Sequence, residues 1–477
     1  MNLDRFLDRS EHDSFERACQ KYPNRAIRLR DDRLDRMLPF SVAPVDWHPR
    51  GRWVLSEQGK HRDSSMPATL NAEGGSVRPA SFLNYAVGDY YIQDAGSLLP
   101  IALLDPKPGE WICDLCAAPG GKASAILESM SGEGLLVANE SIRSRTDVLQ
   151  FMLSRTGHAN YIASSYDPKD LAELLPETFD AVLVDAPCSG QMLVGKEKRS
   201  TNAWTTSQID HSAKRQHRIL DAAIQLVRPG GRIVYSTCTF AEEENESQMA
   251  RVQRLYPDCF KPLSAPELGA WSSPVQEGCY RLWPHRDRCA GGFAGGLRRT
   301  EKPLDFASTN KSKPQRNDQH PRGHSKSERS AIDELHSYGV VGAEVEQRLW
   351  NSGLCIASAQ VWKLLDRRPW LGIPSPGLYN KGSRWLPSHT LALLRSQYFQ
   401  PHQSQDLSSE LATRFVAGEA IQHAIDSTAH VDRHGATGWV VASWQSQSIG
   451  WAKSTANRWN NHLPAWAVQN NISLSDH

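Results

Sequence analysis

Between residues 90 and 300, short apolar runs alternate with longer stretches of helical periodicity. The apolar runs that we interpret as strands are EWICDL (110–115), GLLVANE (134–140), ANYIAS (159–164), FDAVLVD (179–185) and GRIVYST (231–237). The helical patterns lie at 120–130, 142–156, 207–227 and 242–256. This alternation predicts an α/β fold with a mostly parallel sheet and helices on both of its faces. Two further runs, 278–284 and 291–299, are predicted as a closing pair of strands.

The pattern changes on either side of this region. Residues 1–85 are mixed and weakly periodic, and we expect a small N-terminal α/β region, separate from a main domain at 86–300. Residues 301–330 are polar and basic, which is typical of a solvated linker. Regular patterns return at 331–477, where TGWVVASWQSQSIGWAKS predicts a strand, a QSQS turn and a second strand. A chain of 477 residues is expected to hold more than one domain.

Composition excludes several classes of protein. The longest apolar runs are shorter than the roughly 18 residues of a membrane span, and the charged start resembles no secretion signal. Nine cysteines at irregular spacing favour reduced thiols and a cytoplasmic location. The net charge of +1 points to no partner, so a nucleic-acid surface would have to be local. Cys113 and Cys116 form half of a zinc pattern, but no second pair stands at ligand spacing, so we expect no metal.

The segment WICDLCAAPGGKASAILESM (111–130) is predicted to be a strand, a turn of small residues and a helix. Such a turn leaves the backbone open to close approach, and a helix N-terminus favours an anionic group. The P-loop pattern is not met, because Cys116 stands where its first glycine belongs and Ala123 replaces its hydroxyl residue. On this stretch alone, an ordinary strand-to-helix turn stays an alternative.

Two acidic residues after the next two strands favour a nucleoside cofactor. Glu140 follows the second strand at the spacing at which an acid reaches ribose hydroxyls in α/β folds. Asp167 follows the third strand, where it could hold an adenine amino group. Together with the glycine-rich turn, these positions predict S-adenosylmethionine as the cofactor.

Two cysteines stand at the ends of two predicted strands, and each is a candidate for chemistry. Cys188 follows the strand that ends at Asp185, and Cys238 follows the strand that ends in Ser-Thr. The carboxyl ends of parallel strands line one crevice, so we expect both thiols there. A free cysteine is more often a buried core residue than a nucleophile. Two of them beside an aspartate favour a reactive site.

These residue types suit methylation of a pyrimidine at C5. A thiolate that adds to C6 makes C5 nucleophilic, which is covalent catalysis by an activated nucleophile. Cys238 is the predicted nucleophile, since Thr239 and Glu242 have the spacing of a capping box and a helix N-terminus would favour the thiolate. Asp185 is predicted to contact the N3/N4 edge of the base, and Cys188 to aid product release.

The motifs DLCAAPGGK, DAPCSG and STC resemble those of the Nol/Nop/Sun family of RNA 5-methylcytosine methyltransferases. YYIQDAGSLLP (90–100) and CYRLWPHRDRCAGGFAGGLRR (279–299) are also similar to family segments. The resemblance implies a Rossmann-like, S-adenosylmethionine-dependent methyltransferase sheet, with Cys238 attacking the base and Cys188 assisting release. The implied cofactor-binding residues are Cys116, Ala117, Ala118, Pro119, Gly120, Gly121, Lys122, Glu140, Asp167 and Asp185.

The C-terminal region resembles the PUA-like RNA-binding unit of the RsmF-type members, which act on 16S ribosomal RNA. That resemblance implies a β-rich RNA-binding region at 331–477, a second RNA-binding region at 1–85, and 16S rRNA or the small ribosomal subunit as partner. Candidate RNA contacts, each of which could equally be a solvated or core residue, are Lys196, Lys198, Arg199, Lys453, Arg458, Trp451 and Trp459. Methylation of transfer RNA, and a non-catalytic role in ribosome assembly, stay as alternatives. The sequence does not indicate an oligomeric state.

Overall fold

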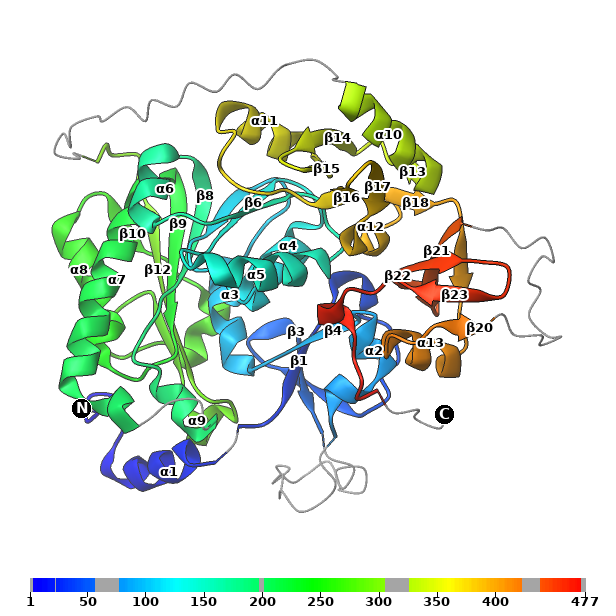
Figure 1. The fold of residues 1–477 in the computed structure, drawn as a ribbon. Helices are drawn as coiled ribbons and strands as arrows, with labels where there is room; N and C mark the ends of the chain where they lie inside the picture. Colours follow the sequence, from blue (N-terminus) through cyan, green and yellow to red (C-terminus); the bar gives the residue numbers. More distant parts are fainter. Residues whose placement is uncertain are drawn as a thin grey trace.

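The computed structural model describes residues 3–21, 23–55, 77–196, 201–304, 326–422 and 438–472. Figure 1 shows a large central sheet with a smaller sheet from the N-terminal residues beneath it and the C-terminal elements beside it. Most of the predicted linker, together with Lys198 and Arg199, lies outside the described residues. No helix among the described residues is long and apolar enough to cross a membrane.

The central sheet has eight strands, in the order β10-β12-β9-β8-β5-β6-β7, with β11 paired to β12. Their bounds are β5 Trp111–Asp114, β6 Leu135–Asn139, β7 Tyr161–Ser164, β8 Phe179–Asp185, β9 Val227–Thr237, β10 Phe260–Pro262, β11 Cys279–Leu282 and β12 Gly292–Arg299. β5 to β9 pair in parallel, whereas β12 runs antiparallel to β9, β10 and β11. The five predicted strands and the closing pair are therefore confirmed.

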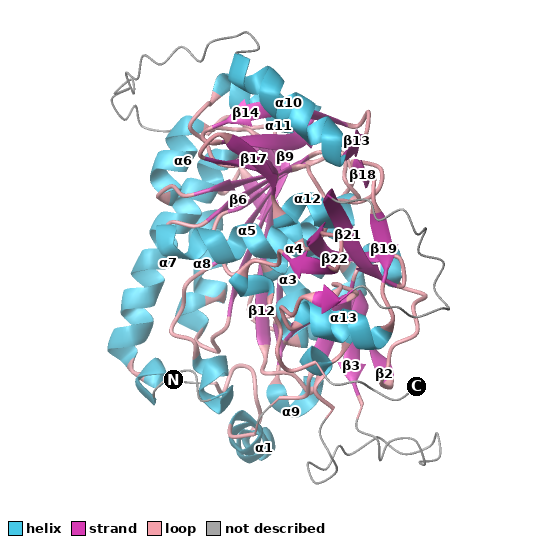
Figure 2. Ribbon diagram, turned by 45° about the vertical axis from the view of Figure 1, so that its right-hand side comes forward, coloured by secondary structure: helices cyan, strands magenta, loops and turns pink. Residues whose placement is uncertain are grey.

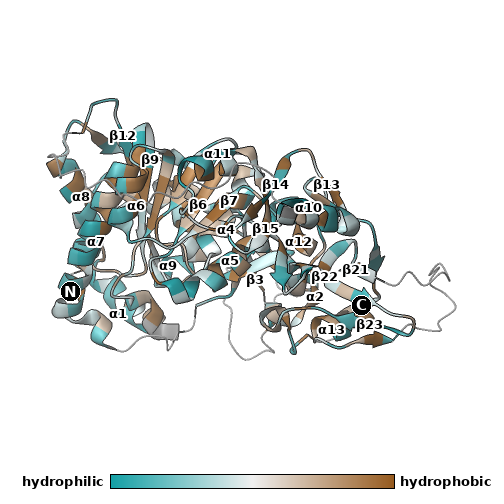
Figure 3. Ribbon diagram, turned by 45° about the horizontal axis from the view of Figure 1, so that its top comes forward, coloured by the Kyte–Doolittle hydropathy of each residue, from teal (hydrophilic) through white to brown (hydrophobic). Residues whose placement is uncertain are grey.

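Helices cover both faces of this sheet (Figure 2). One face carries α3 Leu99–Leu104, α4 Gly121–Met130 and α5 Thr146–Ser154. The other carries α6 Pro168–Leu174, α7 Thr206–Leu226 and α8 Glu246–Leu255. Because both faces are covered, the strands are apolar on both sides, and Figure 3 shows β6 and β9 as hydrophobic bands between more polar helices.

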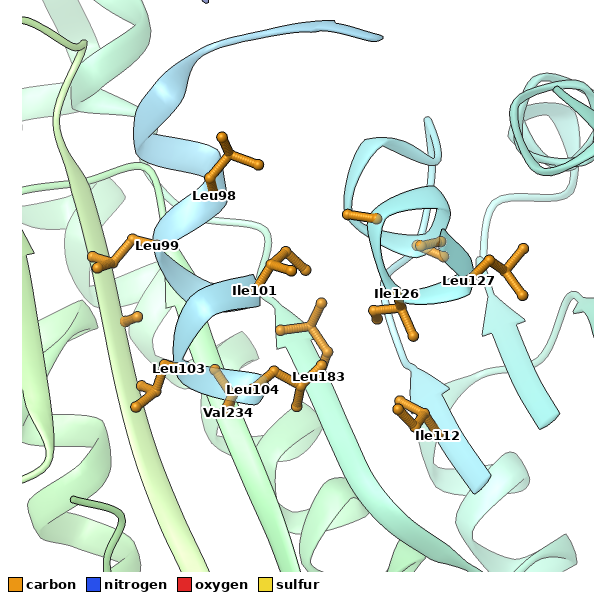
Figure 4. Close-up of a cluster of buried hydrophobic side chains, with 14 of the residues drawn as sticks. Leu98, Leu99, Ile101, Leu103, Leu104, Ile112, Ile126, Leu127, Leu183 and Val234 are labelled. Atoms are coloured by element: carbon orange, nitrogen blue, oxygen red, sulfur yellow. The ribbon is translucent and has the colours of Figure 1, made fainter. Parts of the chain in front are cut away.

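Alternate strand residues separate the two apolar cores. Ile112, Leu183 and Val234 pack with α3 and α4, and Figure 4 shows them together with Leu104 of α3 and Ile126 of α4. Val182 and Ile233, one position earlier along their strands, face the α7 side instead. This alternation follows from the two-residue period of a strand, and it fixes which residues end on the crevice at the carboxyl edge.

The chain reverses its direction of winding at β5, which lies between β6 and β8. In open α/β sheets, ligands bind outside the carboxyl ends of the strands at such a point. The glycine-rich turn after β5 and the two cysteine loops after β8 and β9 all lie at this edge. The Rossmann-like sheet predicted from the sequence is thus present, and it brings the predicted site residues to one side.

The N-terminal part contributes α1 Arg9–Cys19 and a four-stranded sheet in the order β2-β3-β1-β4. Its strands are β1 Ala26–Leu29, β2 Val42–Val45, β3 His48–Val54 and β4 Tyr90–Gln93. β4 lies beyond residue 85, so this sheet extends past the expected end of the N-terminal region. Buried Arg28 and Arg50 bind Glu128 of α4 and connect the small sheet to the central sheet.

The C-terminal part holds two larger sheets rather than one. The first, β14-β15-β16-β17, consists of Val345–Trp350, Gly353–Ser358, Pro376–Lys381 and Arg384–Pro387. With α11 Ala359–Arg367 it contributes Trp362 and Leu365 to the core on the α7 side of the central sheet. This packing onto the central sheet is not indicated by the sequence pattern.

The second sheet has the order β19-β21-β22-β23-β20 and contains the predicted hairpin. β21 Gly438–Trp444 and β22 Gln447–Ser454 pair antiparallel, and Gln445 and Ser446 turn between them with positive φ angles. The other strands are β19 Ser404–Asp406, β20 Ile421–Gln422 and β23 Arg458–Asn461. The β-rich C-terminal region is confirmed.

Further elements between the parts are α2 Leu83–Ala86, α9 Pro284–Asp287, α10 Lys326–Tyr338, β13 Gly339–Val341, α12 His389–Leu393, β18 Phe399–Pro401 and α13 Ser409–Val416.

Candidate active site

A cavity of about 770 Å³ opens at the carboxyl edge of the central sheet. Residues from all five parallel strand ends and from α7 line it, including six that the sequence singled out: Cys116, Glu140, Asp167, Asp185, Cys188 and Cys238. A volume in this range suits a ligand of nucleoside size. The structure thus places both thiols, the aspartate and the two expected nucleoside contacts around one space.

The two thiols on this wall are adjacent. Cys238 Sγ lies 3.0 Å from Cys188 Sγ, and the backbone N–H of Cys238 donates to Cys188 Sγ at 3.3 Å. Neither cysteine forms a disulfide bond. The hydrogen bond with Cys238, together with burial, raises the pKa of Cys188 well above its ordinary value. Cys188 therefore holds its proton and can donate it to the sulfur of Cys238.

A buried polar network fixes the loop that carries Cys188. Glu244 accepts hydrogen bonds from the backbone N–H of Ser189 at 2.9 Å and from Gln216 Nε2 at 2.9 Å. The hydroxyl groups of Ser189 and Thr239 lie 2.8 Å apart and link the two cysteine loops. These contacts hold the two sulfur atoms in register across neighbouring strands.

The capping box expected after Cys238 is not formed. The first turn after β9 is a short 3₁₀ helix, Glu242–Glu244, which is preceded by Ala241 and has no side-chain cap. α8 begins only at Glu246, and Thr239 turns toward Ser189 instead. Local spacing was misleading here because Glu244 and Thr239 satisfy the cysteine loops rather than a helix end. Cys238 is therefore not at the N-terminus of an α-helix, so a helix dipole does not favour a thiolate there, and a stabilising positive charge would have to come from another group.

Lys122 supplies such a charge. Its Nζ lies 2.7 Å from Asp185 Oδ2, while Ser236 Oγ donates to Asp185 Oδ1 at 2.8 Å. Burial lowers the pKa of Lys122, but the charge and hydrogen bond of Asp185 outweigh it and raise that pKa. Lys122 therefore stays cationic and orients the Asp185 carboxylate, a contact different from the direct cofactor contact expected for it.

Asp114, at the end of β5, is fully buried beside this group. Burial and then the charge of Asp185 raise its pKa to about 8. One carboxyl oxygen faces the backbone N–H of Cys116 at 3.4 Å, and the other has no hydrogen-bond partner. A carboxyl that holds a proton at neutral pH explains how this side chain tolerates its position.

The two acids expected to contact a nucleoside are both on the cavity wall and are both held by local contacts. Glu140 accepts from the backbone N–H of Ile142 and from Arg145 Nη1, each at 2.9 Å. Asp167 caps α6 by accepting from the backbone N–H of Lys169 at 2.9 Å. Each carboxylate oxygen can accept further bonds, so both acids retain capacity for a ligand.

The glycine-rich turn is packed more tightly than its sequence indicated. Within the run from Cys116 to Lys122, Cys116 and Ala118 line the cavity. A side chain at Gly120 would lie 2.7 Å from Met152, and the φ angle of 116° there excludes most other residues. A side chain at Gly121 would meet Tyr91. These glycines therefore allow the turn to pack against protein, and Ala117, Pro119, Gly120 and Gly121 are absent from the cavity wall.

Several residues of the site were missed in the sequence. Arg145 lines the cavity, donates a hydrogen bond to Glu140, and donates another to the carbonyl of Ala118 at 2.8 Å. Arg215 and Arg218 of α7 also line it. Their spacing of three residues on a helix face is a signal that could have indicated them. The contact of Ser236 with Asp185 has no comparable sequence signal.

The other predictions about ligands have mixed outcomes. Among the described residues, no group of three or more His, Cys, Asp and Glu side chains could hold a metal ion. Cys113 is fully buried in the sheet. Of the expected RNA contacts, Trp451 is buried in the C-terminal core and is not available for base stacking. Lys453 lies over the ring of Trp439.

Comparisons with known proteins agree with this geometry. Residues 101–298 match the family described as 16S rRNA methyltransferase RsmB/F, and residues 403–469 match the PUA domain of methyltransferase RsmF. The chain is 30% identical to ribosomal RNA small subunit methyltransferase F of Citrobacter koseri, over 96% of this chain and 93% of that protein. It is 29% identical to the protein of the same name from Escherichia coli O81, over the same shares.

Solved structures show the same fold. The crystal structure of PH0851 has a TM-score of 0.50 and 26% identity, and the match covers 62% of this chain and 64% of that one. The matched families include both the sheet with the two thiols and the C-terminal hairpin unit, as the sequence motifs indicated. The chain belongs to the ribosomal RNA small subunit methyltransferase F family.

Proposed function

We propose that this protein methylates C5 of a cytosine in 16S ribosomal RNA, with S-adenosylmethionine as the methyl donor and a transient bond between Cys238 Sγ and C6 of the base. The observation that carries the proposal is the pair of sulfur atoms 3.0 Å apart on the wall of a nucleoside-sized cavity. A single thiol would suffice for addition to C6, so a second thiol in contact with it favours a separate role in release.

Cys238 is the nucleophile in this proposal. Its thiolate is favoured by the S–H group of Cys188 and by the cationic Lys122 nearby. Addition forms the S–C6 bond and moves the electron pair of the C5–C6 double bond toward C5. This step makes C5 able to accept a methyl group.

Asp185 holds the base at its N3/N4 edge. Lys122 and Ser236 occupy one lone pair on each of its oxygens, which leaves the remaining lone pairs for the exocyclic amine of cytosine. Its side chain is about one-third exposed on the cavity wall. Because two protein donors fix the Asp185 carboxylate in one rotamer, that side chain would already be oriented when the base binds.

S-adenosylmethionine supplies the methyl group when it is bound. The residues of the cavity fit such a cofactor: Glu140 and Asp167 offer carboxylates for ribose hydroxyls and an adenine amine, and the glycine-rich turn leads into the N-terminus of α4. Arg145 positions Glu140 for this contact.

After methyl transfer, the C5 proton must leave and the S–C6 bond must break. Cys188 lies next to the bonded sulfur and has a raised pKa, so once its own proton has passed to solvent its thiolate is a strong base for the C5 proton. Loss of that proton restores the C5–C6 double bond and expels Cys238 as a thiolate. The base must be unpaired or flipped out to reach this cavity, at a cost of a few kcal/mol.

The test is bisulfite sequencing of 16S rRNA after incubation with the purified protein and S-adenosylmethionine. The RNA, as free 16S rRNA and as small subunits, comes from a strain that lacks the gene. We expect one or a few protected cytosines that are absent without protein. Protection confined to transfer RNA in a parallel reaction would contradict the 16S assignment, and protection of no RNA would contradict the activity.

A further inference from the structure

A second cavity, of about 480 Å³, lies where the N-terminal residues, α5 and the C-terminal region meet. Its charged side chains are unequal in sign: four arginines and one histidine face a single carboxylate. These residues are Arg30, Arg33, Arg155, Arg395, His389 and Asp32. Burial lowers the pKa of His389 to about 4, so the histidine adds no charge at neutral pH. The active-site cavity is lined by both acidic and basic side chains, so the excess of positive charge is a feature of this second cavity.

Two of the four guanidinium groups are already neutralised. Arg30 binds Asp32 through two hydrogen bonds of 2.7 and 3.0 Å. Arg395 binds Asp31, behind the cavity wall, through two hydrogen bonds of 3.1 and 2.5 Å. These pairs fix the wall and leave Arg155 and the more loosely paired Arg33 as the remaining sources of positive charge.

Arg33 and Arg155 lack such partners. Arg33 Nε is buried without a hydrogen bond, and the nearest oxygens of Asp32 and Asp89 lie 3.6 and 3.8 Å from its guanidinium. Among the described residues, Arg155 contacts no carboxylate. Its Nη2 donates to the carbonyl of Tyr85 at 2.5 Å, and its guanidinium lies over the rings of Tyr85 and Phe151.

Arg155 and Arg30 approach one point beside Gly88. An added side-chain carbon at Gly88 would lie 3.8 Å from both Arg155 Nη2 and Arg30 Nη1. Two like charges held this close repel each other; burial, first, and the charge of Arg30 lower the pKa of Arg155. An anion between them would relieve that cost, and a guanidinium fork suits the oxygens of a phosphate.

An aromatic platform borders the cavity. The ring of Trp466 lies 4.5 Å from that of Phe151 and 5.2 Å from that of His389, and both of these residues line the cavity. Trp466 itself is 54% exposed, which is unusual for so large an apolar side chain. Exposed aromatic faces next to cationic side chains are typical of single-stranded RNA sites, where bases stack and phosphates pair with arginine.

We propose that this junction cavity binds a backbone phosphate of the substrate RNA through Arg33 and Arg155, with a neighbouring base stacked on Trp466. The inference rests on the proposed function for the nature of the ligand. α5 connects the two cavities: Arg145 precedes its first turn at the active site, and Phe151 and Arg155 lie at its other end. The helix has nine residues and is about 14 Å long, so one RNA strand can reach both cavities.

The experiment measures binding of in vitro transcribed, fluorescently labelled 16S rRNA fragments by anisotropy, without S-adenosylmethionine, across a series of KCl concentrations. The variants are Arg33→Gln, Arg155→Gln and Trp466→Ala. Arg348→Gln is the matched control, because Arg348 is partly buried and paired with Glu346 and Asp366 away from the junction. Thermal unfolding of each variant confirms that it is folded.

We expect each arginine variant to bind more weakly and to lower the slope of log K against log [KCl] by about 0.7, the loss of one phosphate contact in single-stranded RNA. Trp466→Ala should weaken binding by about 5- to 100-fold with an unchanged slope, because stacking carries no charge. The control should match the wild type. The rate of methyl transfer should be unchanged in the Arg348→Gln control.

Wild-type slope and affinity in both arginine variants would overturn the inference. If Arg155→Gln does not fold, Arg33→Gln and Trp466→Ala decide the matter. Because binding is measured without methyl transfer, a failure of the proposed chemistry leaves this result interpretable. If the wild-type protein binds no RNA, both the proposed function and the proposed phosphate site are contradicted.

Discussion

Lys122 Nζ lies 2.7 Å from Asp185 Oδ2, and this ion pair connects the glycine-rich turn after β5 to the cysteine loop after β8. Both side chains come from sequence motifs that suggested separate tasks, one for the cofactor and one for the base. Their contact holds the Asp185 carboxylate in place, and in the proposed mechanism the charge of the lysine also favours the Cys238 thiolate. In the proposed mechanism, the positive charge of the site comes from the Lys122 side chain and not from a metal ion.

Replacing Lys122 by Met should lower the single-turnover rate of methyl transfer by about 100-fold, the cost of a small misplacement of a catalytic group. The substitution frees Asp185 Oδ2 and removes the charge that favours the Cys238 thiolate. Lys107→Met is the control, since Lys107 forms an exposed pair with Asp105. A wild-type rate in the Lys122 variant would show that the ion pair is only structural.

Replacing Cys238 by Ala should lower methyl transfer by several orders of magnitude, because the proposed bond to C6 loses its sulfur atom. Binding of S-adenosylmethionine, measured by calorimetry, should stay at the wild-type level. Cys259→Ala should keep full activity, as this thiol faces the carbonyl of Pro303 away from the cavity. Residual activity close to wild type in the Cys238 variant is incompatible with covalent catalysis at this position.

Glu128 is the common partner of two buried arginines, so its loss should destabilise the protein strongly. Glu128 Oε2 lies 3.1 Å from Arg28 Nε and 3.0 Å from Arg50 Nη1, and all three side chains are less than one-tenth exposed. Glu128→Ala leaves two buried guanidinium groups without a carboxylate, which should lower the free energy of unfolding by about 3–5 kcal/mol.

Denaturant unfolding of Glu128→Ala, compared with Glu419→Ala, tests this prediction. Glu419 pairs with Arg414 on the surface, so its loss should cost at most about 1 kcal/mol. Equal effects of the two substitutions would mean that the connection between the N-terminal sheet and α4 contributes little to stability.

The stability of the protein should depend on the protonation of Asp114. Its pKa is about 8 in the folded state and about 3.9 in an unfolded chain, so the folded state holds a proton that the unfolded state releases between these values. The resulting contribution to stability is fully present below pH 4 and is lost as the pH rises through 8. The slope for one proton is at most about 1.4 kcal/mol per pH unit.

Asp114→Asn removes this titration while it keeps the shape of the side chain. Between pH 6 and pH 8, the free energy of unfolding should fall less in this variant than in the wild type. Parallel curves for the two proteins would show that Asp114 is ionised in the folded state, and would require a different partner for its buried oxygen.

The sequence predicted the elements of the site better than their contacts. Apolar runs such as VLVD and IVYST are long enough and bounded clearly enough to identify strands, and strand ends bring Asp185 and Cys238 to one edge. Side-chain partners depend on elements that meet only after folding. The contact between Lys122 and Asp185, which are 63 positions apart in the chain, shows this.

Local spacing was least reliable where tertiary contacts compete for the same groups. Thr239 and Glu242 have the spacing of a capping box, yet Thr239 contacts Ser189, and Glu242 binds Arg5 near the N-terminus. The glycines of the turn after β5 are explained by packing against Met152 and Tyr91 rather than by an open backbone. The sheet that begins with β14 packs onto the central core through α11, an arrangement that no periodicity within the chain encodes.

The covalent bond between protein and RNA is tested most directly in the Cys188→Ala variant. Without the second thiol, release should fail, and the protein should accumulate as a complex with 16S rRNA that survives denaturing electrophoresis. Nuclease and protease digestion followed by mass spectrometry then locates the bound nucleotide. We predict a 5-methylcytidine nucleotide attached to Cys238; attachment to another residue, or no stable complex at all, would contradict the mechanism.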